Sequence, residues 1–198
     1  SKTFAELGIN LTSQESLSKL KILVPTDIQS KTIPVILTQK EDVVALAKTG
    51  TGKTLAYGLP LLQLINTENS AVQTLILAPT RELSQQIFSN LTEYGSQNPA
   101  IKVAVVSGGI PIKPQIEHLK TTFHIIVATP GRILDLISRG DISLKNVSSL
   151  VLDEADEMIS TFKDDLERII KKIPASHRTL LFTATLSGQV KQLSLIHI

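Results

Sequence analysis

The sequence predicts an α/β fold: a single domain in which a mostly parallel central sheet carries helices on both faces. Short apolar runs recur along the 198 residues, and most lack the alternation of a strand with one face in water. Amphipathic segments of helical period separate these runs. A glycine-rich turn joins the first run to a helical pattern. Together, the three observations indicate strands buried between two layers of helices.

The elements are expected in alternating order. The N-terminal part begins irregularly and continues as a helix that ends near residue 22, with Thr12-x-x-Glu15 as a possible capping box. A second helix follows Thr26 and ends near Leu37. The expected strands are 43–46, 74–78, 103–106, 125–128, 150–152 and 180–182. The expected helices after residue 54 are one starting near 55 and those at 81–94, 114–120, 132–138 and 164–172.

Composition excludes several classes of protein. Hydrophobic residues make up 42% and charged residues 19%, as in a globular domain with a full core. The net charge of +2 gives no support for nucleic-acid binding, although it does not exclude a local basic groove. The absence of cysteine excludes disulfides and thiolate metal sites. No run has the length of a membrane span or a signal core, so we expect no membrane contact and, by default, a cytoplasmic protein.

The histidines have no metal-ligand spacing, and we expect them on the surface or in loops. They are His118, His124, His177 and His197.

The segment Ala47-Lys48-Thr49-Gly50-Thr51-Gly52-Lys53-Thr54 has the pattern of a phosphate-binding loop. Gly50 and Gly52 permit backbone angles that gather several N–H groups around phosphate oxygens, and the following helix presents its positive end to the same anion. Lys53 would reach the β- and γ-phosphates, while Thr54 would offer its hydroxyl to Mg²⁺. Ala47 departs from the usual first glycine. A flexible turn is the plain alternative, and a dinucleotide fingerprint would need a third small residue where Leu55 stands.

Acidic residues follow the strand expected at 150–152, in the order Asp153-Glu154-Ala155-Asp156. Asp153 would contact Mg²⁺ through water, because Mg²⁺ loses its hydration shell reluctantly. Glu154 would orient or deprotonate an attacking water. The alternative is a solvated acidic helix start that the helix dipole favours. A strand before the acids and a separate phosphate loop favour a nucleotide-hydrolysing site.

Three further strand ends carry polar groups. They are Pro79-Thr80-Arg81-Glu82-Leu83, Ser107-Gly108-Gly109 and Thr129-Pro130-Gly131-Arg132. Taken singly, each is typical of ordinary structure, since Thr80 and Thr129 suit helix N-caps and Pro130 suits a first helical position. Taken together, they place arginines, hydroxyls and helix N-termini on one edge of the sheet. That edge would suit a line of phosphates in a nucleic-acid backbone.

Gln29 has two interpretations. Thr26-x-x-Gln29 is a capping box, so the amide of Gln29 would bond the backbone at the helix start. The same amide both donates and accepts, and it could read an adenine edge. The segment alone favours the cap.

Joined in order, these motifs resemble the DEAD-box RNA helicases, specifically their first RecA-like domain. Phe4 with Pro25-Thr26-Asp27-Ile28-Gln29 is similar to the Q motif, and residues 47–54 are similar to motif I. The segments 79–83, 108–109 and 129–132 resemble motif Ia, the double glycine and motif Ib. Residues 153–156 are identical to motif II, and Thr183-Ala184-Thr185 resembles motif III. The resemblance covers 1–198 as one N-terminal RecA-like P-loop domain, with a Q-motif region at 1–38 and a P-loop core at 39–198.

The resemblance implies an ATP-dependent RNA helicase that couples ATP hydrolysis to RNA unwinding or remodelling, with ATP and Mg²⁺ as cofactors. It implies that Lys53, Asp153 and Glu154 are catalytic and that Thr54 and Asp153 hold Mg²⁺. The implied nucleotide contacts are Ile22, Gln29, Thr49, Gly50, Thr51, Gly52, Lys53 and Thr54. The implied contacts with the RNA backbone, largely independent of base sequence, are Thr80, Arg81, Gly109, Thr129, Gly131 and Arg132. Asp156, Thr183 and Thr185 would couple the two sites.

Three departures from the family pattern bear on function. Lys21 and Ile22 stand where the family usually has glycine and an aromatic residue that packs on adenine, so weaker nucleotide binding or looser adenine selectivity is expected. Thr183 replaces the usual serine but keeps its hydroxyl, and the tail 195–198 matches no motif. Nothing in the 198 residues resembles the second RecA-like domain. Because related enzymes gain ~10³–10⁵ in rate from an arginine finger, we expect this chain alone to bind nucleotide with little turnover.

Two alternatives from other classes remain. One is a noncatalytic module that binds nucleotide or RNA, and the other is a DNA helicase or related P-loop ATPase. The sequence leaves the oligomeric state open, with a monomer expected.

Overall fold

Parallel strands form one sheet in the computed structural model, which describes residues 1–191. The strands of the described part are β1 (Val43–Leu46), β2 (Thr74–Leu77), β3 (Val103–Val106), β4 (Ile125–Ala128), β5 (Ser149–Asp153) and β6 (Arg178–Thr183). Their order across the sheet is β1-β6-β5-β2-β4-β3, and every neighbouring pair is parallel. The predicted parallel sheet is therefore confirmed.

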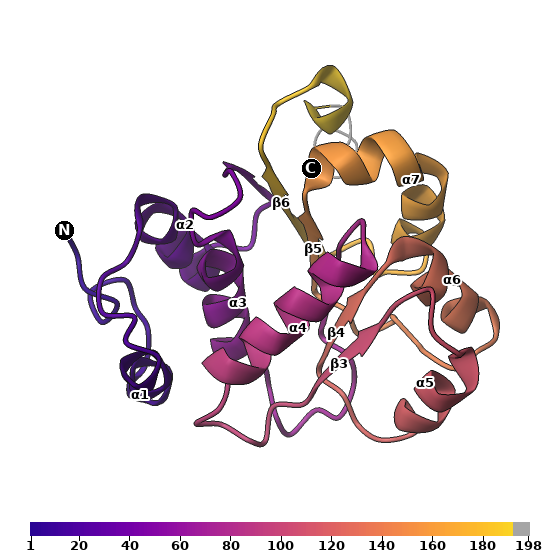
Figure 1. Ribbon diagram of the computed structural model, residues 1–198, viewed down its shortest axis with the longest axis horizontal. Coiled ribbons are helices and arrows are strands. Elements are labelled where there is room, and N and C mark those ends of the chain that lie inside the picture. Colours follow the sequence, from indigo (N-terminus) through magenta and orange to yellow (C-terminus); the bar gives the residue numbers. More distant parts are fainter. Residues whose placement is uncertain (192–198) are drawn as a thin grey trace.

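Helices cover both faces of this sheet (Figure 1). They are α1 (Leu11–Lys19), α2 (Asp27–Thr38), α3 (Lys53–Gln63), α4 (Arg81–Tyr94), α5 (Ile112–His118), α6 (Pro130–Ser138) and α7 (Ala155–Ile170). Side chains of α2, α3 and α4 form one core with the sheet, and side chains of α6 and α7 form the other. None of the helices in residues 1–191 is long and apolar enough to cross a membrane.

The two cores explain why the strands are apolar without a break. Along β2, Leu75 and Leu77 belong to the core beneath α6 and α7, whereas Ile76 belongs to the core beneath α3 and α4. All three side chains are fully buried. Because successive side chains of a strand point to opposite faces, a strand covered on both faces buries every position, as in β2, β4, β5 and β6. The edge strands β1 and β3 leave some side chains partly exposed.

The strand register brings the carboxyl ends of the strands to one edge. Leu77 of β2 aligns with Ala128 of β4 and with Leu152 of β5. Val106 of β3 aligns with the same Ala128, and Leu46 of β1 aligns with Thr183 of β6. The loops after these strands therefore leave the sheet at nearly the same level. In such folds, ligands bind at this edge.

The boundaries of several predicted helices were wrong. The cap of α1 is Asn10, whose side chain accepts a hydrogen bond of 2.9 Å from Ser13 N, so Thr12 lies inside the first turn. α5 begins and ends earlier than predicted, and α6 includes Pro130 and Gly131. α7 starts directly after Glu154 rather than near residue 164. Its backbone is non-helical at Phe162, and this kink interrupts the period that the sequence presents.

The described histidines lie on the surface or in loops, as predicted. His124 lies in the loop before β4 but is buried there, and its Nδ1 accepts a hydrogen bond of 3.0 Å from the backbone N–H of Lys102. His118 is exposed and His177 lies in a loop, as expected, while His197 lies outside the described residues.

The N-terminal region packs on α3 through a small apolar cluster of its own. Phe4, Leu7 and Ile9 contact Leu55 and Leu59 in this cluster, and Ile22 lies against it. This packing fixes α1 and α2 beside the start of α3. The region before residue 39 therefore forms part of the same domain as the sheet.

Lys21 follows the C-cap residue of α1, Leu20, and adopts a left-handed conformation, with φ of 59°. Its N–H bonds Ser18 O at 3.0 Å, and the N–H of Ile22 bonds Leu17 O at 2.9 Å. This pair of bonds is the Schellman arrangement, in which the left-handed residue is usually glycine. A lysine at this position carries backbone strain, because its Cβ approaches the following carbonyl.

Candidate nucleotide and nucleic-acid site

The turn between β1 and α3 has the backbone shape of an anion-binding loop. Gly50 and Gly52 adopt φ of 84° and 81°, which side chains disfavour. The hydroxyl of Thr51 donates to Lys48 O at 2.6 Å and closes the loop on itself. Gly52 is the residue before α3, so the free N–H groups of the helix start open into the turn. The predicted loop geometry is present.

Gln29 ties the start of α2 to this turn. Its Oε1 accepts from Thr26 N at 2.9 Å, and its N–H bonds Thr26 Oγ1 at 3.4 Å, so the predicted capping box is confirmed. Its Nε2 donates to Gly52 O at 3.0 Å. An amide oxygen accepts twice and an amide nitrogen donates twice, so Gln29 keeps capacity for a ligand. Adenine contact stays a prediction.

Lys53 faces the acidic pair at the end of β5. Its Nζ lies 2.8 Å from Asp153 Oδ1 and 3.8 Å from Glu154 Oε1. Asp153 is fully buried and Lys53 nearly so. A buried charge is tolerated only when it is paired or coordinates an ion, and here three ionisable groups meet. The structure thus brings together the three residues that the sequence predicts to be catalytic.

Tyr57 belongs to the same cluster, and sequence reasoning missed it. Its hydroxyl donates to Asp153 Oδ2 at 2.7 Å, and its side chain is fully buried. The signal available in the sequence was spacing: Tyr57 follows Lys53 by four residues, so both lie on one face of α3. The contact with Asp153 depends on tertiary packing, which that spacing alone does not reveal.

Glu154 has an unusual backbone and an unusual acidity. Its φ of 51° is left-handed, which is rare for a residue with a side chain and is found most often at functional sites. Partial burial raises the pKa of the Glu154 carboxyl, and a hydrogen bond with Glu157 raises it further, while the charge of Lys53 opposes both. A raised pKa makes the Glu154 carboxylate a stronger base than an ordinary glutamate.

Asp156 joins this acidic segment to the end of β6. Thr185 donates to Asp156 Oδ2 at 3.0 Å, and Thr183 donates to Thr185 O at 2.7 Å. The N–H of Ala47, where the turn begins, bonds Thr183 O at 2.9 Å. The three residues predicted to couple the sites therefore form a continuous chain of bonds to the phosphate loop.

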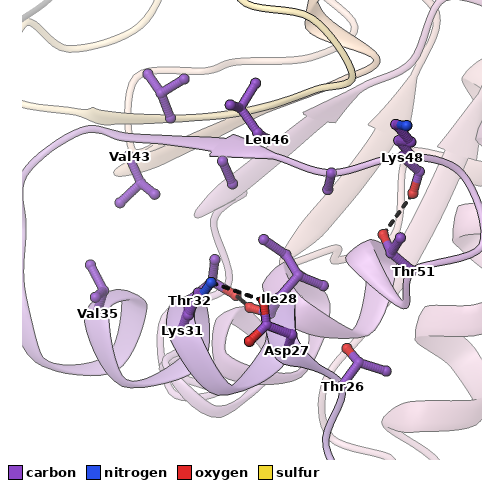
Figure 2. Close-up of a pocket in the computed structure, with 13 residues that line it drawn as sticks. Thr26, Asp27, Ile28, Lys31, Thr32, Val35, Val43, Leu46, Lys48 and Thr51 are labelled. Carbon is purple, nitrogen blue, oxygen red and sulfur yellow. Dashed lines mark hydrogen bonds and ion pairs between the residues drawn. The ribbon is translucent and has the colours of Figure 1, made fainter.

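Two hollows lie beside the glycine turn, and they differ in chemistry. The larger, about 740 Å³, is a groove between α2 and β1 that contains the Asp27–Lys31 ion pair and reaches the Thr51–Lys48 bond (Figure 2). The smaller, about 410 Å³, is lined by Ala47, Thr49, Lys53, Glu154, Asp156, Glu157, Ser160 and Ala184. Of these two hollows, only the smaller is lined by Lys53, Glu154 and Asp156, so it suits phosphate and metal chemistry.

The residues fit a magnesium nucleotide. Asp153 Oδ1 is buried and makes no hydrogen bond within residues 1–191, although Lys53 lies close to it. No group of three or more histidine or acidic residues in that range could hold a metal by itself. Mg²⁺ is usually held by one or two carboxylates together with water and substrate phosphates, and this donor set has that composition. Ile22 does not line the smaller hollow and packs instead beside Phe4.

The remaining candidate residues lie at the ends of β2, β3 and β4. Thr80 caps α4 by accepting from Leu83 N at 3.2 Å, as predicted. Arg81 is exposed and lies close to Gly109. Thr129 makes no cap bond, because its hydroxyl accepts from Gly108 N at 3.2 Å instead. Gly131 is exposed at the start of α6.

Arg132 is less available than the sequence suggests. Its guanidinium donates to Gln115 Oε1 at 2.8 Å and to Ile110 O at 2.9 Å. Gln115 is buried and in turn donates to Ser107 O at 3.2 Å. Two of the five guanidinium donors are thus used to hold the double-glycine loop.

Comparison with known proteins identifies the family. The model of the DEAD/DEAH box helicase family matches residues 26–193. The chain is 44% identical over 193 residues to the DEAD-box ATP-dependent RNA helicase CshA of Geobacillus kaustophilus, covering 97% of this chain and 41% of that protein. It is also 44% identical to CshA of Streptococcus pneumoniae serotype 4, covering 96% of this chain and 36% of that protein.

Solved structures agree. A DEAD box protein from the hyperthermophile Methanococcus jannaschii superposes with a TM-score of 0.93 at 39% identity, covering 99% of this chain and 53% of that one. A hypothetical ATP-dependent RNA helicase from Sulfolobus tokodaii superposes with a TM-score of 0.85 at 37% identity, covering 96% of this chain and 55% of that one. The chain spans about two fifths of the length of the curated relatives it matches. It belongs to the DEAD/DEAH box helicase family.

Proposed function

We propose that this domain is the ATP-binding core of an ATP-dependent RNA helicase, which couples ATP hydrolysis to unwinding or remodelling of RNA. The observation that carries the proposal is the meeting of Lys53, Asp153 and Glu154 at the mouth of the glycine turn. Its support from relatives is the CshA proteins, which are named ATP-dependent RNA helicases. A buried lysine between two acids beside a free helix start suits a nucleotide triphosphate and its metal.

Each side chain has a defined task in this proposal. The loop amides and Lys53 bind the β- and γ-phosphates, and Gln29 reads the adenine edge. Asp153 and Thr54 hold Mg²⁺, partly through water; the ion, when bound, neutralises phosphate charge in the transition state. Glu154 orients the attacking water and accepts its proton on a carboxylate oxygen. Its raised pKa favours that proton transfer.

Nucleotide binding by calorimetry tests the first half of the proposal. With Mg²⁺ present, ATP and ADP should bind, and GTP should not. Lys53→Ala should abolish binding, whereas Lys31→Ala, on the exposed face of α2, should not change it. Gln29→Ala removes both the donor and the acceptor of the amide, so it should lose the preference for adenine nucleotides. Absence of adenine-nucleotide binding at millimolar concentration contradicts the proposal.

The second half assigns the ends of β2, β3 and β4 to RNA. Arg81 is exposed there beside Gly109, and two helix N-termini open to the same edge. Such groups bind phosphates whatever the base sequence, and a 2′-hydroxyl distinguishes RNA from DNA. A competition between RNA and DNA of one sequence should favour RNA. Arg81→Ala should weaken binding, while Arg139→Ala should not, because Arg139 pairs with Asp135 at the other end of α6.

A further inference from the structure

The side chain of Tyr57 is buried against Asp153, beside the phosphate loop. It lies on the second turn of α3, and neither its side chain nor Asp153 has any exposed surface. The ring packs on Phe182 of β6, with 5.0 Å between ring centroids and 54° between planes. Its hydroxyl donates to Asp153 Oδ2 at 2.7 Å. The ring contact and the hydrogen bond together hold the phenol against Asp153.

The strand and the helix impose this contact. Val151 belongs to the core beneath α3, and Asp153 follows it by two residues, so its side chain points to the same face of the sheet. Lys53 and Tyr57 are four residues apart and stand one above the other on α3. The carboxylate of Asp153 is therefore held at two points, by Lys53 near Oδ1 and by Tyr57 on Oδ2.

The two oxygens of Asp153 consequently differ. Oδ2 is occupied by the phenol, whereas Oδ1 is buried without a hydrogen bond in the described part of the chain. The phenol donates this bond, because a carboxylate oxygen can only accept.

We propose that Tyr57 is a positioning residue for the magnesium site, and that its hydroxyl turns Asp153 so that Oδ1 faces the hydrated ion. The inference rests on the proposed function, because Asp153 must first hold the metal. Groups that orient a metal-binding carboxylate typically contribute 10–100-fold to metal affinity when tested by substitution, an order of magnitude we take as about tenfold or more here. A purely structural hydroxyl would instead affect nucleotide binding equally with and without the metal.

The test separates metal-dependent from metal-independent binding. ADP affinity is measured with Mg²⁺ and with EDTA in the wild type, Tyr57→Phe and Tyr94→Phe. Tyr94 is the matched control, because it is the other tyrosine of the chain and packs on the apolar clusters. In Tyr57→Phe, the gain in affinity from Mg²⁺ should fall about tenfold or more, with the affinity in EDTA unchanged. Tyr94→Phe should leave both unchanged.

Other outcomes overturn the inference. An undiminished gain in Tyr57→Phe means that the hydroxyl does not serve the metal. Equal losses in Mg²⁺ and in EDTA mean that the hydroxyl only supports the fold. If the wild type itself binds no adenine nucleotide, the proposed function fails, and this result is distinct from the other two.

A spectroscopic measurement covers the case in which Tyr57→Phe does not fold. In the Tyr94→Phe background, biosynthetic 3-fluorotyrosine labels Tyr57 alone. Its ¹⁹F resonance should shift when Mg²⁺ is added to the ADP complex, because the ion changes the charge on the carboxylate that the phenol bonds. A resonance that is identical with Mg²⁺ and with EDTA overturns the inference.

Discussion

The guanidinium of Arg132 is bonded to the side-chain oxygen of Gln115 at 2.8 Å, and this bond joins the start of α6 to α5. Through Ile110 O and Ser107 O, the same two side chains hold the loop that contains Gly108 and Gly109. The arginine therefore has a structural task before any ligand arrives. That task can be measured without RNA.

Removal of this link should destabilise the domain. Gln115→Ala leaves Ser107 O without the amide donor and the Arg132 guanidinium with Ile110 O alone, in a partly buried place, which costs about 1–3 kcal/mol in the free energy of unfolding. Arg132→Ala should cost a similar amount. The double variant should cost less than the sum of the two single variants, because both of them remove the same bond between Arg132 and Gln115. Denaturant unfolding measures all three. Arg139→Ala is the control, since its exposed ion pair with Asp135 is worth about 0–1 kcal/mol. If the cost of the double variant equalled the sum of the two single costs, the link between Gln115 and Arg132 would be contradicted.

Lys21→Gly should stabilise the domain. The left-handed conformation costs a residue with a side chain roughly 1–2 kcal/mol, and glycine avoids this cost. Glycine also has a larger entropy in the unfolded state, which cancels part of the gain, so the net increase in stability should be about 0.5–1 kcal/mol. Thermal and denaturant unfolding would detect the change. Lys19→Gly, two residues earlier and inside α1, should have the opposite sign, with a loss of about 1 kcal/mol. Equal signs for the two variants would show that the φ of 59° at Lys21 is not retained.

Gly52→Ala should do more damage than Gly50→Ala. Both glycines have a positive φ, so each substitution carries the left-handed strain of roughly 1–2 kcal/mol. A Cβ at Gly52 would also collide with Gln29 Nε2, whereas a Cβ at Gly50 would meet nothing within 4 Å. Unfolding experiments on both variants isolate the effect of the contact. In a Gln29→Ala background, Gly52→Ala should lose that excess and cost only the strain.

The acidity of Glu154 should respond to Glu157. Burial and the Glu157 hydrogen bond raise the pKa of Glu154 above its ordinary value of 4.5, so Glu157→Gln should lower it. Lys53→Met should raise it, because the opposing charge is lost. Carbon-detected NMR titration of the Glu154 carboxyl measures both shifts. An unchanged pKa in both variants would mean that neither neighbour acts on this carboxyl.

The raised pKa of Glu154 also sets the sign of a stability change with pH. The folded state holds the proton more tightly than the unfolded chain does. This contribution to stability is therefore fully present below pH 4.5 and is lost as pH rises through the raised pKa of the folded state. Glu154→Gln cannot lose a proton, so its stability relative to the wild type should increase across that window. A flat difference between the two proteins would contradict the shift.

Sequence patterns predicted the sheet better than its surroundings. Strands 103–106 and 125–128 matched to the residue, because short apolar runs between turns leave few other interpretations. The start of α7 was missed, since Glu154 enters it from a left-handed conformation and Phe162 breaks its period. Both features depend on tertiary context that local propensity does not contain.

The site shows the same division. Lys53, Asp153 and Glu154 were predicted together because strand ends and a glycine turn place them at one edge. Tyr57 was missed because its partner lies 96 residues away in the chain. Contacts at that separation depend on how the helix packs on the sheet. Local patterns in the sequence do not reveal that packing.

The aligned register of the strands fixes the spacing between residues at the carboxyl edge of the sheet. Asp153 ends β5 and Thr129 follows β4, with only β2 between these two strands. Neighbouring strands lie about 4.8 Å apart, so the proposed metal site at Asp153 and the proposed RNA site at Thr129 are separated by roughly 10 Å of hydrogen-bonded backbone. Loop substitutions can change how strongly either side binds. They leave this spacing intact, because the hydrogen bonds between the strands set it.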